Sequence, residues 1–283
     1  MARLQGRTAI VTGGAVGIGR HYSQALAAEG AQVMIADIKD GAALAAEISA
    51  KHGRNSTDSM VFDVSDEAQC KALVAKTIER FGKIDILINN AALYAPLPTL
   101  SIADMDTDLW NKVMAINIRG PMLMVKHVAP HMIAKKYGKI VNIGSGTVAR
   151  GIPDFSHYVT SKGAVTAFTR CMSRELGDHG IRVNTVSPSF VETPMTVPTM
   201  PAMRPTLSVL GIASIITGKI HLNVKPTELG AIINAAVDSV RPTAERARLK
   251  VESAVSGALT GFLVTSTHEH KANVAATTTC TCA

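Results

Sequence analysis

The sequence predicts an α/β fold in three layers, with a doubly wound parallel sheet between helices. Three observations lead to this prediction. Short apolar runs alternate with segments of helical spacing from residue 8 to residue 186. A glycine-rich turn, from Gly13 to Gly19, joins the first apolar run to the first helical segment. Glycine, proline or polar residues follow the predicted strands, and the carboxyl ends of parallel strands are where such folds bind ligands.

The alternation defines each element in turn. The expected strands cover residues 8–12, 32–36, 59–62, 84–88, 140–143 and 182–186. The expected helices cover residues 18–29, 41–52, 65–81, 106–135 and 157–178. Ser65 is expected to be the N-cap of the third helix. Because strand–helix–strand connections are right-handed, these elements build one sheet that is covered on both faces.

A chain of 283 residues can form one large α/β domain, and neither an internal repeat nor an interdomain linker is visible. We expect a single domain over residues 1–267. Within it, residues 193–217 are rich in Pro, Met and Thr and are expected to form a mobile substrate loop or lid. A helix over 227–240 and a last strand over 259–264 are expected before a disordered tail, 268–283.

The composition excludes several classes of protein. The net charge of +7 is modest, and no run of Lys and Arg is long enough for a nucleic-acid-binding arm. The longest apolar runs, residues 84–93 and 207–216, are about half as long as a membrane span. The four cysteines form no secreted framework, and the His and Cys residues near the C-terminus lack the spacing of a zinc site. We therefore expect a cytoplasmic protein that binds neither nucleic acid, nor membranes, nor a metal.

The glycine turn is suited to a dinucleotide phosphate. Gly13, Gly17 and Gly19 follow a strand and open a helix. Glycines at such positions let the backbone turn tightly and let its amides approach a pyrophosphate at the helix N-terminus. Glycine turns are common, so this motif gains its weight from the residues that accompany it.

Asp37 ends the second predicted strand, where it can select the cofactor. Its carboxylate can accept hydrogen bonds from the adenosine ribose hydroxyls and repel a 2′-phosphate. The flanking Val16 and Ile38 carry no charge that would attract this phosphate, and Lys39 is expected to point away. These charges favour NAD over NADP.

A second group of residues can move a proton on and off an oxygen. Tyr158 and Lys162 are four positions apart and therefore share one face of a helix. A free tyrosine has a pKa of about 10, and a nearby ammonium group or an oxidised nicotinamide ring favours the phenolate. Ser145 can hydrogen-bond the substrate oxygen as charge develops. Asn117 is expected to bend its helix and to support a water that links Lys162 to solvent.

Taken together, these motifs resemble those of the short-chain dehydrogenase/reductase family. The matching motifs, within residues 3 to about 196, are Thr12-Gly13-x-x-x-Gly17-x-Gly19, Asp63-Val64, Asn89-Asn90-Ala91, Asn117, Ser145, Tyr158-x-x-x-Lys162 and Arg182-Val183-Asn184. The resemblance implies a Rossmann-like subunit, assembly into a homotetramer or homodimer, and an Asn-Ser-Tyr-Lys active site.

The resemblance also implies the positions of the cofactor site. Asp63 and Val64 are expected at the adenine, Asn89 near the ribose, and Pro188 and Thr193 near the nicotinamide amide. The remaining residues expected to bind the cofactor are Ile18, Ala91 and Val191, together with Tyr158 and Lys162.

The sequence departs from the family pattern in three places. Ala92 stands where Asn-Asn-Ala is usually followed by Gly, and Ser189 stands where Pro is usually followed by Gly. Val264 is followed by Thr265-Ser266-Thr267, where the family usually has Asp-Gly-Gly. Residues 241–283 are therefore divergent, frame-shifted or disordered, and the sequence alone does not choose between these alternatives.

The motifs and the resemblance together predict an oxidoreductase that transfers a hydride between NAD and a hydrophobic secondary alcohol or its ketone. The expected substrate lining, residues 93–97, 147–155 and 193–210, is apolar with few charges, which favours an apolar alcohol over a sugar or an acid. Two alternatives stay open. One is an NADPH-dependent carbonyl reductase, and the other is a non-catalytic cofactor-binding member of the family with a divergent C-terminus.

Overall fold

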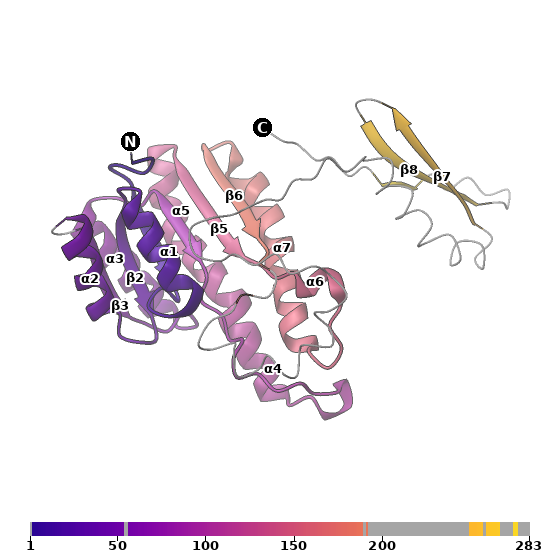
Figure 1. Cartoon of the computed structure of the whole chain (residues 1–283), viewed down its shortest axis with the longest axis horizontal. Helices are drawn as coiled ribbons and strands as arrows, with labels where there is room; N and C mark the ends of the chain where they lie inside the picture. Colours follow the sequence, from indigo (N-terminus) through magenta and orange to yellow (C-terminus); the bar gives the residue numbers. More distant parts are fainter. Residues whose placement is uncertain are drawn as a thin grey trace. The chain divides into compact units, whose positions relative to one another are not determined.

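The chain separates into two compact units, Met1–Ile215 and Ile216–Ala283. A computed structural model describes residues 2–53, 56–188 and 191, and the backbone of Leu249–Ser256, Leu259–Ser266 and Val274–Ala276 (Figure 1). The predicted substrate loop at 193–217, the helix at 227–240 and Thr193 lie outside the described residues.

The first unit contains the predicted parallel sheet. Its strands are β1 (Thr8–Thr12), β2 (Gln32–Asp37), β3 (Thr57–Val61), β4 (Ile86–Asn89), β5 (Gly138–Ile143) and β6 (Ile181–Val186). All pairs are parallel, in the order β3-β2-β1-β4-β5-β6. The order reverses between β1 and β4, so the crevice at their carboxyl ends is where a doubly wound sheet binds its ligand.

Helices cover both faces of this sheet, which confirms the three-layer prediction (Figure 1). They are α1 (Gly17–Ala28), α2 (Ala42–His52), α3 (Glu67–Phe81), α4 (Thr107–Met114), α5 (Gly120–Lys135), α6 (Thr147–Arg150) and α7 (Ser156–Gly177), with a short 3₁₀ turn at Ile102–Asp104. Alternate strand residues point to opposite faces. Ile10, Met34 and Leu87 therefore join the core beneath α3 and α5, whereas Val11, Val33 and Ile88 join the core beneath α1 and α2.

The long helix predicted over 106–135 is continuous but changes its winding in the middle. A π-helical segment, Ala115–Arg119, connects α4 to α5. Asn117 lies in this segment and is buried. A π-helical turn widens the helix locally, often at a functional position. Asn117 was expected to bend this helix, and the structure shows a change of winding at that residue.

The start of α3 differs from the prediction. Asp66, not Ser65, is the N-cap, and its carboxylate accepts a hydrogen bond of 3.2 Å from the Gln69 backbone N–H. The Ser65 hydroxyl instead donates to the Asp63 carboxylate over 2.7 Å. Ser65 is therefore occupied at the strand end, and the next residue caps the helix.

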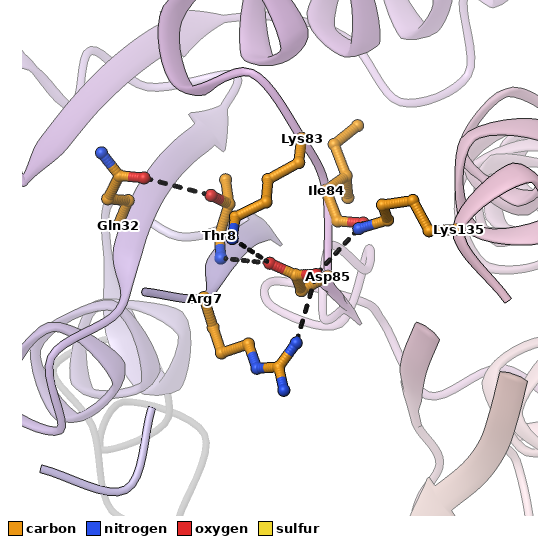
Figure 2. A network of polar contacts seen from close by, with 7 residues as sticks. All are labelled: Arg7, Thr8, Gln32, Lys83, Ile84, Asp85 and Lys135. Atoms are coloured by element: carbon orange, nitrogen blue, oxygen red, sulfur yellow. Dashed lines mark hydrogen bonds and ion pairs between the residues drawn. The ribbon is translucent and has the colours of Figure 1, made fainter. Parts of the chain in front are cut away.

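A network around Asp85 fastens the opposite, amino-terminal edge of the sheet (Figure 2). The carboxylate is almost fully buried and accepts hydrogen bonds from the Thr8 backbone N–H at 3.0 Å and from Lys135 Nζ at 2.8 Å. Arg7 and Lys83 lie 3.7 Å from it. Lys135 also donates to the Ile84 carbonyl oxygen, so α5 is held to the segment that leads into β4.

The second unit contains a small antiparallel sheet of β7 (Leu249–Ser256), β8 (Leu259–Ser266) and β9 (Val274–Ala276). The strand expected over 259–264 is present as β8, but it pairs antiparallel with β7 and β9. The strand β7 was not predicted, and β9 lies within the expected tail. The single domain over 1–267 remains a prediction, because these strands are described by their own pairing alone.

Among the described helices, none combines the length and the apolar composition that a bilayer span requires.

Candidate active site

A cavity of about 600 Å³ opens at the carboxyl ends of the parallel strands. The glycine turn and the end of β2 line one part of it, and the segment after β5 and α7 line another. Fifteen of the predicted site residues line it: Gly13, Val16, Gly17, Ile18, Gly19, Asp37, Ile38, Asp63, Val64, Ala91, Ser145, Tyr158, Lys162, Pro188 and Val191. The predicted phosphate, ribose and proton-transfer residues therefore share one space.

The glycine turn is held against the end of β4 by Asn90. The Asn90 side-chain amide donates to the carbonyl oxygens of Thr12 and Gly13 at 3.0 and 2.9 Å. Gly13 has a φ of +61°, and a Cβ there would approach the Ala91 Cα to 2.9 Å. A Cβ on Gly19 would collide with the Gly13 carbonyl. This turn thus depends on glycine for both its conformation and its close packing.

Asn90, and not Asn89, is the asparagine at the end of β4 that lines the cavity. Asn90 lines the cavity, whereas the Asn89 side chain is buried behind it and donates to Asn142 Oδ1 at 2.8 Å. Successive residues at a strand end point to opposite sides. The structure therefore does not bring the Asn89 side chain to the cavity, and Asn90 lines it although the motifs did not single it out.

Asp37 is buried at the end of β2 and is held by two backbone amides. Its Oδ2 accepts a hydrogen bond from Ala15 N–H at 2.9 Å, and its Oδ1 accepts one from Lys39 N–H at 3.0 Å. A carboxylate has about four acceptor positions, so both oxygens keep capacity for ribose hydroxyls. Lys39 is exposed and is also one of the residues that line the cavity. The expectation that its side chain points away stays a prediction.

The part of the cavity beside Asp63 is suited to a flat, apolar ring. Phe62, Val64 and Ile116 line the cavity there, together with Asp63. The Asp63 carboxylate is fixed by the Ser65 backbone N–H at 2.8 Å as well as by the Ser65 hydroxyl. Phe62 and Ile116 are wall residues that the motifs did not single out.

Tyr158 and Lys162 lie on α7 and face the end of β5. The pKa of Tyr158 is raised above its ordinary value because the phenol is buried, while its hydrogen bond with Ser145 acts in the opposite direction. Burial lowers the pKa of Lys162 to about 8. Lys162 Nζ donates to the Ile143 carbonyl oxygen at 2.7 Å and lies 5.8 Å from the centroid of the Tyr158 ring. The pKa of Tyr158 therefore lies above the usual value for tyrosine, and the pKa of Lys162 lies below the usual value for lysine.

Ser145 is oriented by the start of α6. Its Oγ accepts hydrogen bonds from the Thr147 backbone N–H at 3.2 Å and from the Thr147 hydroxyl at 2.9 Å. A serine hydroxyl that accepts two such bonds keeps its own proton to donate. Ser145 can therefore act as a donor toward an oxygen in the cavity.

Asn117 does not line the cavity, and it acts on its surroundings instead. Its Oδ1 accepts a hydrogen bond from Leu93 N–H at 2.7 Å, and its Nδ2 donates to the Leu93 carbonyl at 3.2 Å and to Ser161 Oγ at 3.0 Å. It thereby joins the loop after β4 to α7. The expected role of Asn117 in a water link to Lys162 stays a prediction.

The wall beyond Tyr158 mixes aromatic, apolar and charged side chains. Two predicted lining segments contribute to it, and the residues are Leu93, Tyr94, Thr147, Arg150, Ile152 and Phe155. Lys112 on α4 also lines the cavity and was not predicted. Arg150 Nε donates to the Gly146 carbonyl at 3.3 Å. Lys112 and Arg150 make this wall more polar than the sequence segments indicated.

Comparison with known proteins assigns the chain to a family. The family model described as short chain dehydrogenase matches residues 7–203. The chain belongs to this family.

Individual short-chain dehydrogenases match at similar levels. The 3-oxoacyl-[acyl-carrier-protein] reductase FabG of Thermotoga maritima is 35% identical over 196 residues, which is 69% of this chain and 78% of that protein. A crystal structure of levodione reductase has a TM-score of 0.67 at 35% identity, covering 72% of this chain and 79% of the other. A crystal structure of NAD⁺-bound xylitol dehydrogenase has a TM-score of 0.64 at 32% identity, covering 67% and 72%.

Membership of the short-chain dehydrogenases identifies the protein with a family of oxidoreductases that bind a nicotinamide cofactor and act on small molecules. The residues present fit such a cofactor. Glycines leave room for a pyrophosphate, Asp37 offers ribose acceptors, and Phe62, Val64 and Ile116 form an apolar wall for a base.

Proposed function

We propose that the protein is an NAD-dependent dehydrogenase that oxidises a secondary alcohol to its ketone, or catalyses the reverse reduction. One observation carries this proposal: the glycine turn and Asp37 share a cavity with Ser145, Tyr158 and Lys162. When bound, the nicotinamide ring accepts or supplies the hydride.

In this proposal, Tyr158 takes the proton of the substrate hydroxyl. Burial opposes its ionisation, so the phenolate needs positive charge nearby, which Lys162 supplies. Ser145 donates a hydrogen bond to the substrate oxygen while charge develops there. Asn117 acts indirectly, because it holds Leu93 and Ser161 on either side of the reacting groups.

The cofactor proposal rests on Asp37. A buried carboxylate with free acceptor capacity favours ribose hydroxyls and repels a 2′-phosphate. The second candidate, an NADPH-dependent carbonyl reductase, is favoured by Lys39, a cationic residue that lines the same cavity and would attract that phosphate.

For the substrate, we propose a secondary alcohol whose carbon skeleton packs on Leu93, Ile152 and Phe155. We further propose a homodimer or homotetramer, as is common in the family, and a cytoplasmic location.

Calorimetric titration with NADH and with NADPH tests the proposal. NADH should bind at least tenfold more tightly than NADPH. Asp37→Ala should remove this preference, because the repulsion of a 2′-phosphate is lost, and Lys39→Ala should sharpen it. A wild-type protein that prefers NADPH, with that preference lost in Lys39→Ala, would establish the second candidate instead.

The control for chemistry is Tyr158→Phe. This variant keeps the ring but loses the proton acceptor, so it should bind the cofactor like wild type and lose turnover by at least a hundredfold. Wild-type turnover in Tyr158→Phe contradicts the mechanism. Cofactor binding without turnover by the wild type, on a broad alcohol and ketone panel, indicates a non-catalytic family member.

A further inference from the structure

The backbone on both sides of Ser145 is held to the end of β6. Gly144 N–H donates a hydrogen bond to the Val186 carbonyl at 2.8 Å, and Gly146 N–H donates one to the Pro188 carbonyl at 2.9 Å. These bonds continue the parallel pairing of β5 with β6 beyond the two strands. With its backbone held in this way, Ser145 keeps two freedoms, the rotation of its side chain and the rotation of its hydroxyl group.

Thr147 is anchored independently of the Ser145 side chain. It is the first residue of α6, and its carbonyl accepts a hydrogen bond of 2.9 Å from Gly151 N–H, which closes this short helix. Val148 N–H donates to the Ser145 carbonyl at 3.3 Å and closes the turn that leads into α6. Thr147 therefore faces Ser145 from a fixed position.

The Ser145 hydroxyl accepts two hydrogen bonds, and Thr147 donates both. They come from the backbone N–H at 3.2 Å and from the hydroxyl group at 2.9 Å. A hydroxyl oxygen has two acceptor positions and one proton. Ser145 therefore has no acceptor position left, and it can only donate to a further partner. Tyr158 lines the same cavity as Ser145 and is one such partner.

This direction has a consequence for the substrate. A substrate hydroxyl beside Ser145 cannot donate to an oxygen whose acceptor positions are both filled, so its proton is directed to Tyr158. Its oxygen is free to accept the proton of Ser145. The two groups therefore cannot exchange their roles, and the hydrogen bond from Ser145 strengthens as negative charge develops on the substrate oxygen.

The same direction affects Tyr158 itself. A phenol oxygen that accepts a hydrogen bond is stabilised as the phenolate, whereas a phenol that donates is stabilised in its protonated form. Ser145 acts in the first way, because its hydrogen bond lowers the pKa of Tyr158 while burial raises it. With a free acceptor position on Ser145, Tyr158 could donate to it instead, and the contact would then favour the protonated phenol.

We propose that Thr147 is a positioning residue that sets the direction of a series of hydrogen bonds, from its own hydroxyl to Ser145 and from Ser145 to the oxygen of Tyr158 or of the substrate. Hydrogen bonds in series polarise one another, so the Thr147 hydroxyl also strengthens the donation from Ser145. No bond of Thr147 is made or broken in the reaction. This inference rests on the proposed function and gives a role to a residue that the sequence assigned only to the substrate lining.

Thr147→Val tests the role of the hydroxyl, because it keeps the branched shape and the backbone N–H. In the oxidation of cyclohexanol by NAD, kcat/KM should fall roughly fivefold, the worth of one hydrogen bond, and the loss should be in kcat more than in KM. The acid limb of the pH profile of kcat/KM should move to higher pH, because the phenolate of Tyr158 is less stabilised. Thr147→Ser keeps the hydroxyl and should restore both properties to within about twofold of the wild type.

Thr166→Val is the matched control. It makes the same change on α7, where the Thr166 hydroxyl donates to the Lys162 carbonyl at 3.2 Å, and it should keep the wild-type pH profile. A purely structural Thr147 would lower Tm in Thr147→Val but would leave the acid limb in place. An unmoved limb in Thr147→Val overturns the inference, as does a Thr147→Ser variant that behaves like Thr147→Val.

Neutron diffraction from wild-type crystals exchanged into D₂O needs no turnover and therefore separates this inference from the proposed function. The deuterium on Thr147 Oγ1 should point to Ser145 Oγ, and the deuterium on Ser145 should point into the cavity. That result supports the role of Thr147 even if the protein oxidises no alcohol, an outcome that counts against the dehydrogenase alone. A Ser145 deuterium directed at Thr147 Oγ1 overturns the inference even in an active enzyme.

Discussion

Lys162 shows most clearly, at the scale of single residues, that this site is built at a cost to stability. Its ammonium group is buried, and its single described hydrogen bond runs to the Ile143 carbonyl. Each pKa unit corresponds to about 1.4 kcal/mol. A lysine whose pKa falls to about 8 on folding therefore costs the native state roughly 3 kcal/mol at neutral pH.

Lys162→Met should consequently stabilise the protein while abolishing turnover. Loss of the buried charge outweighs the unsatisfied Ile143 carbonyl, and we expect a net gain of about 1 kcal/mol, or roughly 2–4 °C in Tm. Between pH 8 and about 10.4 the unfolded wild type binds more protons than the native state, so wild-type stability should rise with pH there.

Thermal melts at pH 7 and pH 9.5 check both the higher Tm of Lys162→Met and the rise of wild-type stability with pH. Lys162→Met should lack the wild-type rise, whereas the exposed Lys71→Met should keep it. A Tm below that of the wild type at both pH values would show that Lys162 stabilises the fold.

At the scale of elements, the sequence predicts the strands and helices, because each has its own spacing of apolar residues. Apolar runs and helical spacing give six strands and the helices between them, and parallel pairing brings the strand ends together. The direction of an individual side chain is harder to predict from the sequence. Asn89 and Asn90 are adjacent, and only the exact end of β4 decides which one faces the cavity.

The same limit applies to Lys39 and Tyr94. The turn after β2 brings the Lys39 backbone N–H to Asp37 and makes Lys39 one of the residues that line the cavity, which charge patterning does not reveal. The loop that carries Tyr94 is held by Asn117, which hydrogen-bonds Leu93, 24 residues before it in the chain. Such contacts between distant segments exist only in the folded chain.

The amino-terminal edge of the sheet provides the element-scale prediction. Burial on its own would raise the pKa of Asp85, but hydrogen bonds from Lys135 and from the Thr8 amide outweigh it, and this pKa lies below its usual value. Asp85→Asn removes the charge that three cations share, and we expect a loss of about 2 kcal/mol, or roughly 4–8 °C in Tm.

The pH dependence of this loss gives an internal check. An aspartate with a lowered pKa stabilises the native state above its unfolded pKa of about 3.9 and loses that effect as the pH falls through the folded value. The difference between wild type and Asp85→Asn should therefore close in acid. Glu79→Gln, at an exposed position on α3, should leave Tm unchanged at every pH. An equal effect of the two variants would contradict the role of the network.

At the scale of the whole molecule, acid sensitivity should begin well above the range of carboxylates. His157 precedes Tyr158 on α7 and is fully buried. Burial lowers the pKa of His157, so the native state keeps the ring neutral. The unfolded chain takes up this proton below pH of about 6.5. Stability is thus complete above that pH and falls below it.

A variant without this titration should resist mild acid. One proton changes the free energy of unfolding by at most about 1.4 kcal/mol per pH unit, so the wild-type Tm should fall by roughly 2–4 °C between pH 6.5 and 5.5. His157→Met, which fills similar space without a buried polar nitrogen, should reduce this fall. His131→Met, at an exposed position on α5, should retain it. The same pH dependence of Tm in His157→Met and His131→Met would contradict this role of His157. Another group would then be responsible for the loss of stability in mild acid.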